Sequence, residues 1–299
     1  MTTVVLDSRP TFRAITRDYL ELSKSRIVLM VLITTAAGYL FAADRVEPLL
    51  LLHTLIGTAL VAAGTNALNQ YVEREHDGKM HRTRSRPLPA GRITPRAALL
   101  FSSLVAVLGT LYLGVAVNWL TAALGAFTLT SYIFVYTPLK RVSTICTVIG
   151  AVPGAIPPLM GWTAATNELS GVEAIGGWIV FGILFLWQLP HFMAISWLYR
   201  EDYARGGFAM TSVRDEHGSS VAAQAVYYTL ALLPLSIAPT LLGLTGTAYL
   251  IGASAAGAAL LVATIRFFFD RGTGNARAVF MISNLYLMTV MLLLVVDAT

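Results

Sequence analysis

The chain has 299 residues, of which 56% are hydrophobic and 12% are charged, and its mean hydropathy is +0.68. A soluble domain carries about 25% charged residues, so this composition excludes an ordinary soluble protein and indicates a polytopic membrane protein. The single cysteine, Cys146, excludes a disulfide framework within the chain and a metal site built from thiolates. The net charge of +5 does not indicate nucleic-acid binding, because the basic residues gather between apolar segments.

Up to Arg26 the chain is polar and mixed in charge, without the short apolar core of a removable signal peptide. Nine apolar segments follow, each able to span about 30 Å of hydrocarbon. They are 26–43, 49–72, 95–115, 118–136, 143–163, 174–198, 221–242, 246–266 and 278–297. None alternates as a strand would, so we expect an all-α fold of nine transmembrane helices. We expect residues 1–299 to form a single integral-membrane domain, with residues 1–25 as a cytoplasmic segment.

The basic residues are distributed unevenly around the apolar segments. Of the 21 Lys and Arg residues, only Arg45 lies outside the N-terminal segment and the even-numbered loops with their borders. Positive residues favour the cytoplasmic side of a membrane. We therefore expect the N-terminus and the even-numbered loops in the cytoplasm and, with nine spans, the C-terminus on the opposite side.

A strip of oxygen-bearing side chains ends the second apolar segment. Asn69, Glu73 and Asp77 recur every four residues, which places them on one helix face, and Gly78 can then stop the helix. Oxygen ligands suit a hard cation such as Mg²⁺. The other interpretation of this strip is a solvated helix end.

Arginines follow this strip. Arg82, Arg84 and Arg86 precede Pro87 and Pro89, which cannot continue a helix. Guanidinium groups suit phosphate oxygens, so the strip and the arginines together predict a site for a metal-bound diphosphate. In the fourth loop, Lys140 and Arg141 could likewise hold phosphate oxygens, or serve only as an orientation signal.

The fifth segment contains three prolines, Pro153, Pro157 and Pro158, among several glycines. This pattern is typical of a kinked helix that lines a cavity and equally of close packing through small residues. The sequence leaves both interpretations open.

The sixth segment carries a second polar cluster. Gln188, His191, Ile195, Leu198 and Asp202 are spaced so that one continuous helix would place them on one face. Polar groups inside an apolar span are costly and usually functional. Asp202 falls at the same membrane face as Asp77 by topology, so it could share a cation, or it could belong to a solvated charge cluster.

Metal and guanidinium groups at one surface fit the departure of a diphosphate. They neutralise the charge that grows on the leaving oxygens. An allylic carbocation left behind would need an apolar cavity with aromatic faces, and a long isoprenoid tail would need the membrane interior. These features favour prenyl transfer over transport.

At these residues the chain resembles the UbiA superfamily of intramembrane prenyltransferases, over nearly its whole length. The carrying residues are Asn69, Glu73 and Asp77; Met80-His81-Arg82-Thr83; Arg86-Pro87-Leu88-Pro89; Tyr136-Thr137 with Leu139-Lys140-Arg141; Gly154-Ala155, Pro157-Pro158 and Gly161-Trp162; and Trp187-Gln188, Pro190-His191-Phe192, Trp197, Asp202-Tyr203 and Met210. The last block is similar to that of the members that farnesylate heme. The chain departs from the superfamily in having Glu73 where Asp is common and one clear acid, Asp202, in the second cluster.

The resemblance implies a fold, a reaction and roles. Nine helices surround a central cavity open to the cytoplasmic side, and the farnesyl group of farnesyl diphosphate joins the 2-vinyl group of heme b, with water addition, giving heme O and diphosphate. The implied Mg²⁺ ligands are Asn69, Glu73, Asp77 and Asp202, and the implied diphosphate ligands are Arg82, Arg86, Lys140 and Arg141. Gln188 and His191 are candidate heme contacts, although a buried histidine is more often a hydrogen-bonded core residue.

The implied partners are the lipid bilayer, the two substrates and heme-modifying or oxidase-assembly proteins. Two alternatives stay open at this point. One is a prenyltransferase for an aromatic quinone precursor, which would consume a phenolic acid. The other is a heme carrier or transporter without chemistry, which would need no Mg²⁺.

Overall fold

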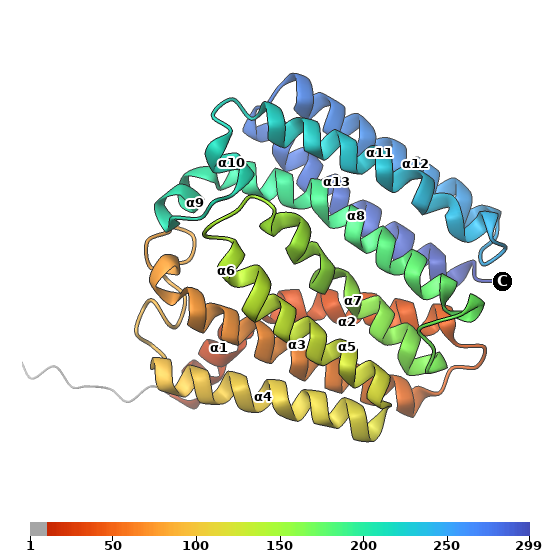
Figure 1. Ribbon diagram of the computed structural model, residues 1–299, viewed down its shortest axis with the longest axis horizontal. Helices are drawn as coiled ribbons and strands as arrows, with labels where there is room; N and C mark the ends of the chain where they lie inside the picture. The colour runs from red at the N-terminus through yellow and green to blue at the C-terminus, as the bar shows by residue number, and fades with distance from the viewer. Residues whose placement is uncertain (1–10) are drawn as a thin grey trace, which may run out of the picture.

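The computed structural model of the protein describes residues 11–299, whose long helices lie side by side in one bundle (Figure 1). Within these residues nine helical segments are long and apolar enough to cross a membrane, which confirms the predicted number and the all-α fold. Their elements are α2 (Ser25–Ala42), α3 (Pro48–Asp77), α4 (Pro95–Ala116), α5 (Trp119–Thr130) continued by η1 (Ser131–Tyr136) and α6 (Thr137–Leu139), α7 (Cys146–Thr166), η2 (Val172–Ala174) continued by α8 (Ile175–Leu198), α11 (Ser219–Leu241), α12 (Thr247–Phe269) and α13 (Thr273–Val296).

Three further helices, which the apolar pattern did not predict, lie at one end of the bundle (Figure 1): α1 (Phe12–Leu22), α9 (Arg200–Gly206) and α10 (Thr211–Arg214). The helix α1 is tied to α3, because the side-chain amide of Gln70 donates to the carbonyl oxygen of Leu22 at 2.7 Å. Arg9, part of the predicted cytoplasmic segment, lies outside the described residues.

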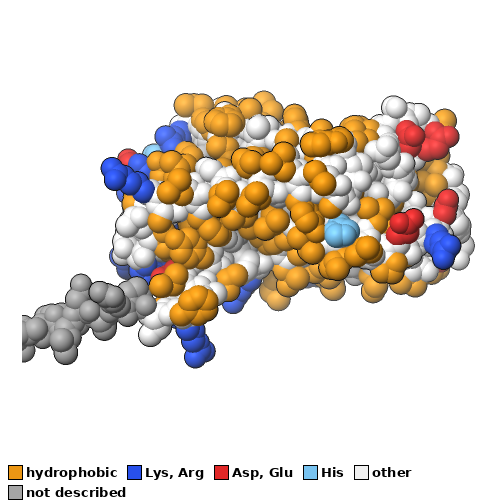
Figure 2. All heavy atoms as spheres, turned by 90° about the horizontal axis from the view of Figure 1, so that it is seen from below, with side chains coloured by type: hydrophobic (Ala, Val, Ile, Leu, Met, Phe, Trp, Pro, Cys, Tyr) orange, Lys and Arg blue, Asp and Glu red, His pale blue; other side chains and the backbone are white. Residues whose placement is uncertain are grey.

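The two ends of the bundle differ in charge. Figure 2 shows several Lys and Arg side chains at one end of the face it displays, a group of Asp and Glu side chains at the other, and a broad hydrophobic belt between them. The first end, here called the basic end, carries α1, α9, α10 and the loops that follow α3, α6, α8 and α12 (Figure 1). The hydrophobic belt is the surface that a lipid bilayer would cover.

The most buried spans are α7 and α8, which lie in the middle of the bundle (Figure 1). The helix α2 crosses α7 closely, because Gly38 faces the backbone of Pro158 and Gly161 faces the carbonyl of Thr35, and an added Cβ at either glycine would collide. Pro153 and Gly154 of the same helix line a cavity. The fifth segment therefore both lines a cavity and packs closely through small residues, and α7 is one helix despite its prolines; its kink stays a prediction.

Two elements add to the sequence predictions. The fourth span ends in the π-helical turn η1, a distortion that is frequent at functional sites. The sixth span ends at Leu198, as predicted, where Tyr199 leaves the helical region with φ −115° and ψ 23°, so Gln188 and Asp202 do not share one continuous helix. Asp202 lies on the separate helix α9, where contacts with the loop after α3 hold its carboxylate.

Candidate active site

The polar strip on α3 is buried at the basic end of the bundle. The helix runs to Asp77 and Gly78 follows it, as the sequence predicted. Asn69, Glu73 and Asp77 are at most 5% exposed. Burying a polar or charged group costs free energy unless it is paired, so each of these side chains needs a partner.

Each member of the strip is paired with a different basic side chain. The Lys24 ammonium donates to Oδ1 of Asn69 at 3.0 Å. The Lys140 ammonium lies 2.9 Å from Oε1 of Glu73, and the Arg86 guanidinium lies 2.7 Å from Oδ2 of Asp77. The structure therefore brings together three predicted metal ligands, two predicted diphosphate ligands and one further lysine.

The π-helical turn η1 positions Lys140 against α3. Thr137, the residue after η1, donates its hydroxyl hydrogen to the carbonyl oxygen of Tyr132 at 2.8 Å and accepts from the Asn69 amide at 3.2 Å. Lys140 then lies with its ammonium 4.4 Å from the centre of the Tyr136 ring, a cation–π contact. Burial acts to lower the pKa of Lys140, but the charge and hydrogen bond of Glu73, together with the nearby Tyr136 and Tyr132, outweigh it and hold that pKa well above its usual value, so the ammonium stays charged.

Lys24 is the site residue that the sequence reasoning missed. It separates α1 from α2 in a left-handed conformation, with φ 52°, which is uncommon for a residue with a side chain. Burial, together with the charges of Arg86 and Lys140, lowers its pKa to about 7. An inward-facing ammonium whose close partner is a neutral amide is suited to an incoming anion. In the sequence, a lysine before an apolar segment is read as an orientation signal, and little in the sequence distinguishes Lys24 from such a signal.

Asp202 holds the loop after α3 in place. Its carboxylate accepts from the backbone N–H of His81 at 2.9 Å and of Arg82 at 3.2 Å, and it also pairs with Arg205. Burial acts to raise the pKa of Asp202, but the hydrogen bonds from Arg205 and the two N–H groups outweigh it, so the pKa lies below its usual value. These contacts give Asp202 a loop-holding role. Its role as a metal ligand stays a prediction.

The other predicted diphosphate ligands lie outside the ion-paired strip. Arg82 is exposed, and its guanidinium stacks on the Tyr199 ring at 4.6 Å. Arg141 is exposed and takes part in no ion pair of the described residues. The binding of phosphate by both residues stays a prediction.

A cavity of about 540 Å³ lies beside the strip, with mostly apolar walls from α2, α3, α7, α8 and α13 and from the turn η1. Asn66, one turn before Asn69 on α3, lines it, and so does Tyr136, which Lys140 covers. The charged strip therefore borders the cavity. Aromatic residues from two sides contribute to the lining, Tyr132 of η1 and Trp187 and Phe192 of α8.

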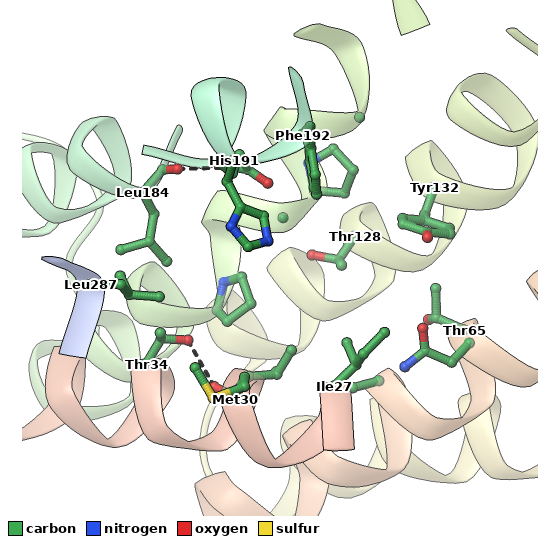
Figure 3. Close-up of a pocket in the computed structure, with 18 of the residues that line it drawn as sticks. Ile27, Met30, Thr34, Thr65, Thr128, Tyr132, Leu184, His191, Phe192 and Leu287 are labelled. Atoms are coloured by element: carbon green, nitrogen blue, oxygen red, sulfur yellow. Dashed lines mark hydrogen bonds between the residues drawn. The ribbon is translucent and has the colours of Figure 1, made fainter. Parts of the chain in front are cut away.

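The structure places both predicted heme contacts in this cavity. Figure 3 shows the His191 ring pointing from α8 into the cavity, across from Met30 and Thr34 of α2. Its Nδ1 lies 2.8 Å from the Ser283 hydroxyl, so Nε2 is the ring nitrogen that remains for a ligand. The Gln188 amide nitrogen donates to the carbonyl oxygens of Ala151 at 2.8 Å and Leu184 at 3.1 Å, which ties α8 to α7.

The oxygen atoms of the α3 strip suit Mg²⁺ only if a bound diphosphate supplies further ligands to the metal. Within residues 11–299 no three Asp, Glu, His or Cys side chains gather closely enough to hold a metal ion. Mg²⁺ is usually bound through one or two carboxylates, several waters and substrate phosphates. The buried oxygen atoms of Asn69, Glu73 and Asp77, which cations now occupy, are donors of that kind.

Comparisons with known proteins agree with this geometry. Residues 31–288 match the UbiA prenyltransferase family. The chain belongs to this family. It is 45% identical over 291 residues to the protoheme IX farnesyltransferase of Solibacter usitatus, a match that covers 94% of this chain and 98% of that protein. The predicted enzyme class, a prenyltransferase of the membrane, is therefore confirmed.

Solved structures share the fold. A digeranylgeranylglyceryl phosphate synthase matches with a TM-score of 0.78 at 20% identity, over 94% of this chain and 98% of that one. A UbiA homolog from Archaeoglobus fulgidus, bound to GPP and Mg²⁺, matches with a TM-score of 0.65 at 16% identity, over 93% of this chain and 99% of that one. At these identities the likeness establishes the helical architecture alone.

Proposed function

We propose that this chain transfers the farnesyl group of farnesyl diphosphate to the 2-vinyl group of heme b, with addition of water, to give heme O and diphosphate. The observation that carries the proposal is the pairing of Lys24, Lys140 and Arg86 with the α3 strip at the border of an apolar cavity. The 45% identity to a protoheme IX farnesyltransferase over nearly the whole chain supports the choice of substrates.

The basic side chains bind the leaving group in this proposal. When farnesyl diphosphate enters, Arg86 and Lys140 exchange their carboxylate partners for phosphate oxygens, and Lys24 and the exposed Arg82 and Arg141 add further donors. The bond between C1 and the bridging oxygen breaks with its electron pair on diphosphate, where these fixed cations stabilise it. Asn69, Glu73, Asp77 and Asp202 would hold Mg²⁺, which when bound would further neutralise the diphosphate charge.

The cavity then contains the allylic cation. Its apolar walls exclude bulk water, and the aromatic faces of Tyr132, Trp187 and Phe192 tolerate positive charge. The π electrons of the heme vinyl group form the new bond to C1, which leaves a cation on the vinyl carbon next to the macrocycle. One water adds there and loses a proton, which completes the hydroxyl group. Gln188 and His191 contact the heme in this arrangement.

The basic end of the bundle faces the cytoplasm in this proposal. Positive residues favour that side, and the loops, short helices and helix ends at this end hold all the Lys and Arg residues that follow the first span except Arg45. The N-terminus is then cytoplasmic, the C-terminus lies on the opposite side, and the cavity opens towards the cytoplasm. Heme-modifying or oxidase-assembly proteins are the partners that would receive the product.

The test is a product assay with purified protein in lipid. Heme b, farnesyl diphosphate and Mg²⁺ are added, and heme O is sought by mass, with EDTA as the control. A metal-dependent product of that mass is expected. Consumption of farnesyl diphosphate only with a phenolic acceptor would move the assignment to the quinone branch. Heme binding without turnover of farnesyl diphosphate, by folded protein, would favour a carrier.

A further inference from the structure

One basic residue borders the cavity without belonging to the ion-paired strip. Arg26 lies in the first turn of α2 and is the one Lys or Arg that the structure places in the cavity lining. Its side chain is exposed, and within residues 11–299 it takes part in no ion pair. A guanidinium at the rim of a mostly apolar cavity is a binding group for an anion.

The diphosphate has other partners. Lys24, Lys140 and Arg86 already converge on the α3 strip. Lys24 lies outside α2 in a left-handed conformation, whereas Arg26 lies in the first turn of α2, and of the two only Arg26 lines the cavity. Since Lys24 is turned to Asn69, Arg26 is left for a second anionic group that enters the same cavity.

The acceptor supplies such a group. Heme b is a broad apolar macrocycle with two propionate carboxylates on one edge. The cavity wall next to Arg26 is apolar and continues inward along α2 through Ile27, Met30 and Val31, while α8 opposite contributes Trp187 and Phe192. A macrocycle between these walls would place its propionate edge at the basic end, where the carboxylates stay near water.

We propose that Arg26 binds a propionate of the acceptor at the cavity rim and makes the site selective for a carboxylate-bearing porphyrin. This inference rests on the proposed function and adds a residue that decides which acceptor binds. A guanidinium presents parallel N–H donors that match both oxygens of a carboxylate. The contact also sets the depth of the macrocycle, because one edge is fixed at the membrane surface.

The experiment compares two ligands that differ only at the carboxylates. Iron protoporphyrin IX and its dimethyl ester are titrated, with absorbance in the Soret region as the readout, into wild type, Arg26→Gln, Arg26→Lys and the control Arg45→Gln, whose arginine is exposed at the opposite end. We expect wild type and Arg45→Gln to bind the diacid about tenfold more tightly than the ester, since hydrogen bonds between charged groups exceed neutral ones. Arg26→Gln is expected to bind both alike, at the ester's affinity, and Arg26→Lys to recover part of the preference.

Other outcomes would overturn the inference. An Arg26→Gln protein that keeps the preference would show that Arg26 only contacts lipid headgroups. Equal weakening of diacid and ester would show a packing role. Weakened binding of farnesyl diphosphate with unchanged porphyrin binding would assign Arg26 to the diphosphate. Equal binding of both porphyrins by wild type would defeat the inference and leave the proposed function standing, whereas no porphyrin binding at all would defeat both.

Discussion

Acidic side chains lie at two places at the basic end of the bundle, on α3 and on α9, and the two places differ in the groups that pair with the carboxylates. On α3, Glu73 and Asp77 are paired with the side chains of Lys140 and Arg86. On α9, Asp202 is held by two backbone N–H groups and Arg205. A side-chain cation can turn to a phosphate when substrate arrives, whereas a backbone N–H cannot leave without moving its loop.

The α3 strip is therefore a binding surface, and Asp202 supports the loop beside it. The α3 strip offers donors and acceptors that can exchange partners, so its variants should affect chemistry more than shape. The carboxylate of Asp202 fixes the backbone of His81 and Arg82, so its variants should affect the loop as well.

Glu73→Gln should reduce product formation by about 100-fold or more, because preorganised charge at a reacting centre is worth that much. Folding should be retained, as judged by helix content and detergent gel filtration. The matched control is Glu75→Gln, two residues on, whose exposed carboxylate pairs only with Arg74. Full activity in Glu73→Gln would remove this residue from the site.

Lys140→Met should destabilise the protein by about 3 kcal/mol, because it leaves the carboxylate of Glu73 buried and unpaired. The double variant Glu73→Gln with Lys140→Met should recover most of the stability but none of the activity. Thermal unfolding in a fixed detergent gives both values, and Lys79→Met, which alters an exposed lysine nearby, is the control. Additive losses in the double variant would contradict the pairing.

Asp202→Asn should lower product formation by about tenfold, which is less than the loss in Glu73→Gln, because the remaining amide oxygen can still accept from one N–H group of the loop while the amide nitrogen cannot accept from the other. Hydrogen exchange at His81 and Arg82 should become faster, since their N–H groups lose a charged acceptor. Glu201→Gln alters the exposed neighbouring acid and should change neither quantity. Unchanged exchange with a raised Mg²⁺ requirement would contradict the loop-holding role and leave Asp202 with its role as a metal ligand alone.

Arg141→Gln should raise the apparent KM for farnesyl diphosphate by only about two- to threefold, because an exposed charge contributes little. The same measurement on Arg86→Ala should give the larger increase, since Arg86 is already fixed against Asp77. An Arg141 effect equal to that of Arg86 would mean that the loop after α6 closes over the diphosphate.

Much of the fold could be predicted from the sequence because its signals are strong. Nine apolar segments and one-sided basic loops fixed the number of spans, and the spacing of Asn69, Glu73 and Asp77 placed them on one helix face. The end of α8 at Leu198 agrees with the predicted segment, whereas the separate helix α9 and the contacts of Asp202 could not be predicted, since those contacts come from a loop about 120 residues away in sequence.

The pairing within the site also lay beyond the sequence. Lys140, which pairs with Glu73, follows the π-helical turn η1 closely in the chain, and such a turn has no clear sequence signal. Lys24 enters the site through a left-handed turn that its type does not favour. Local patterns predict which residues share an element, whereas these contacts depend on how elements pack.

In the mechanism proposed above, diphosphate binds at the α3 strip. Arg86 and Lys140 exchange their carboxylate partners for phosphate oxygens, and Mg²⁺ binds together with the diphosphate. Calorimetric titration with farnesyl thiodiphosphate, which ionises slowly, tests it directly, in Mg²⁺ and in EDTA, with wild type and Glu73→Gln. Tight binding by wild type in Mg²⁺, and clearly weaker binding in EDTA or in the variant, is the predicted result. Equal affinity in all four titrations would contradict the claim and place the diphosphate elsewhere.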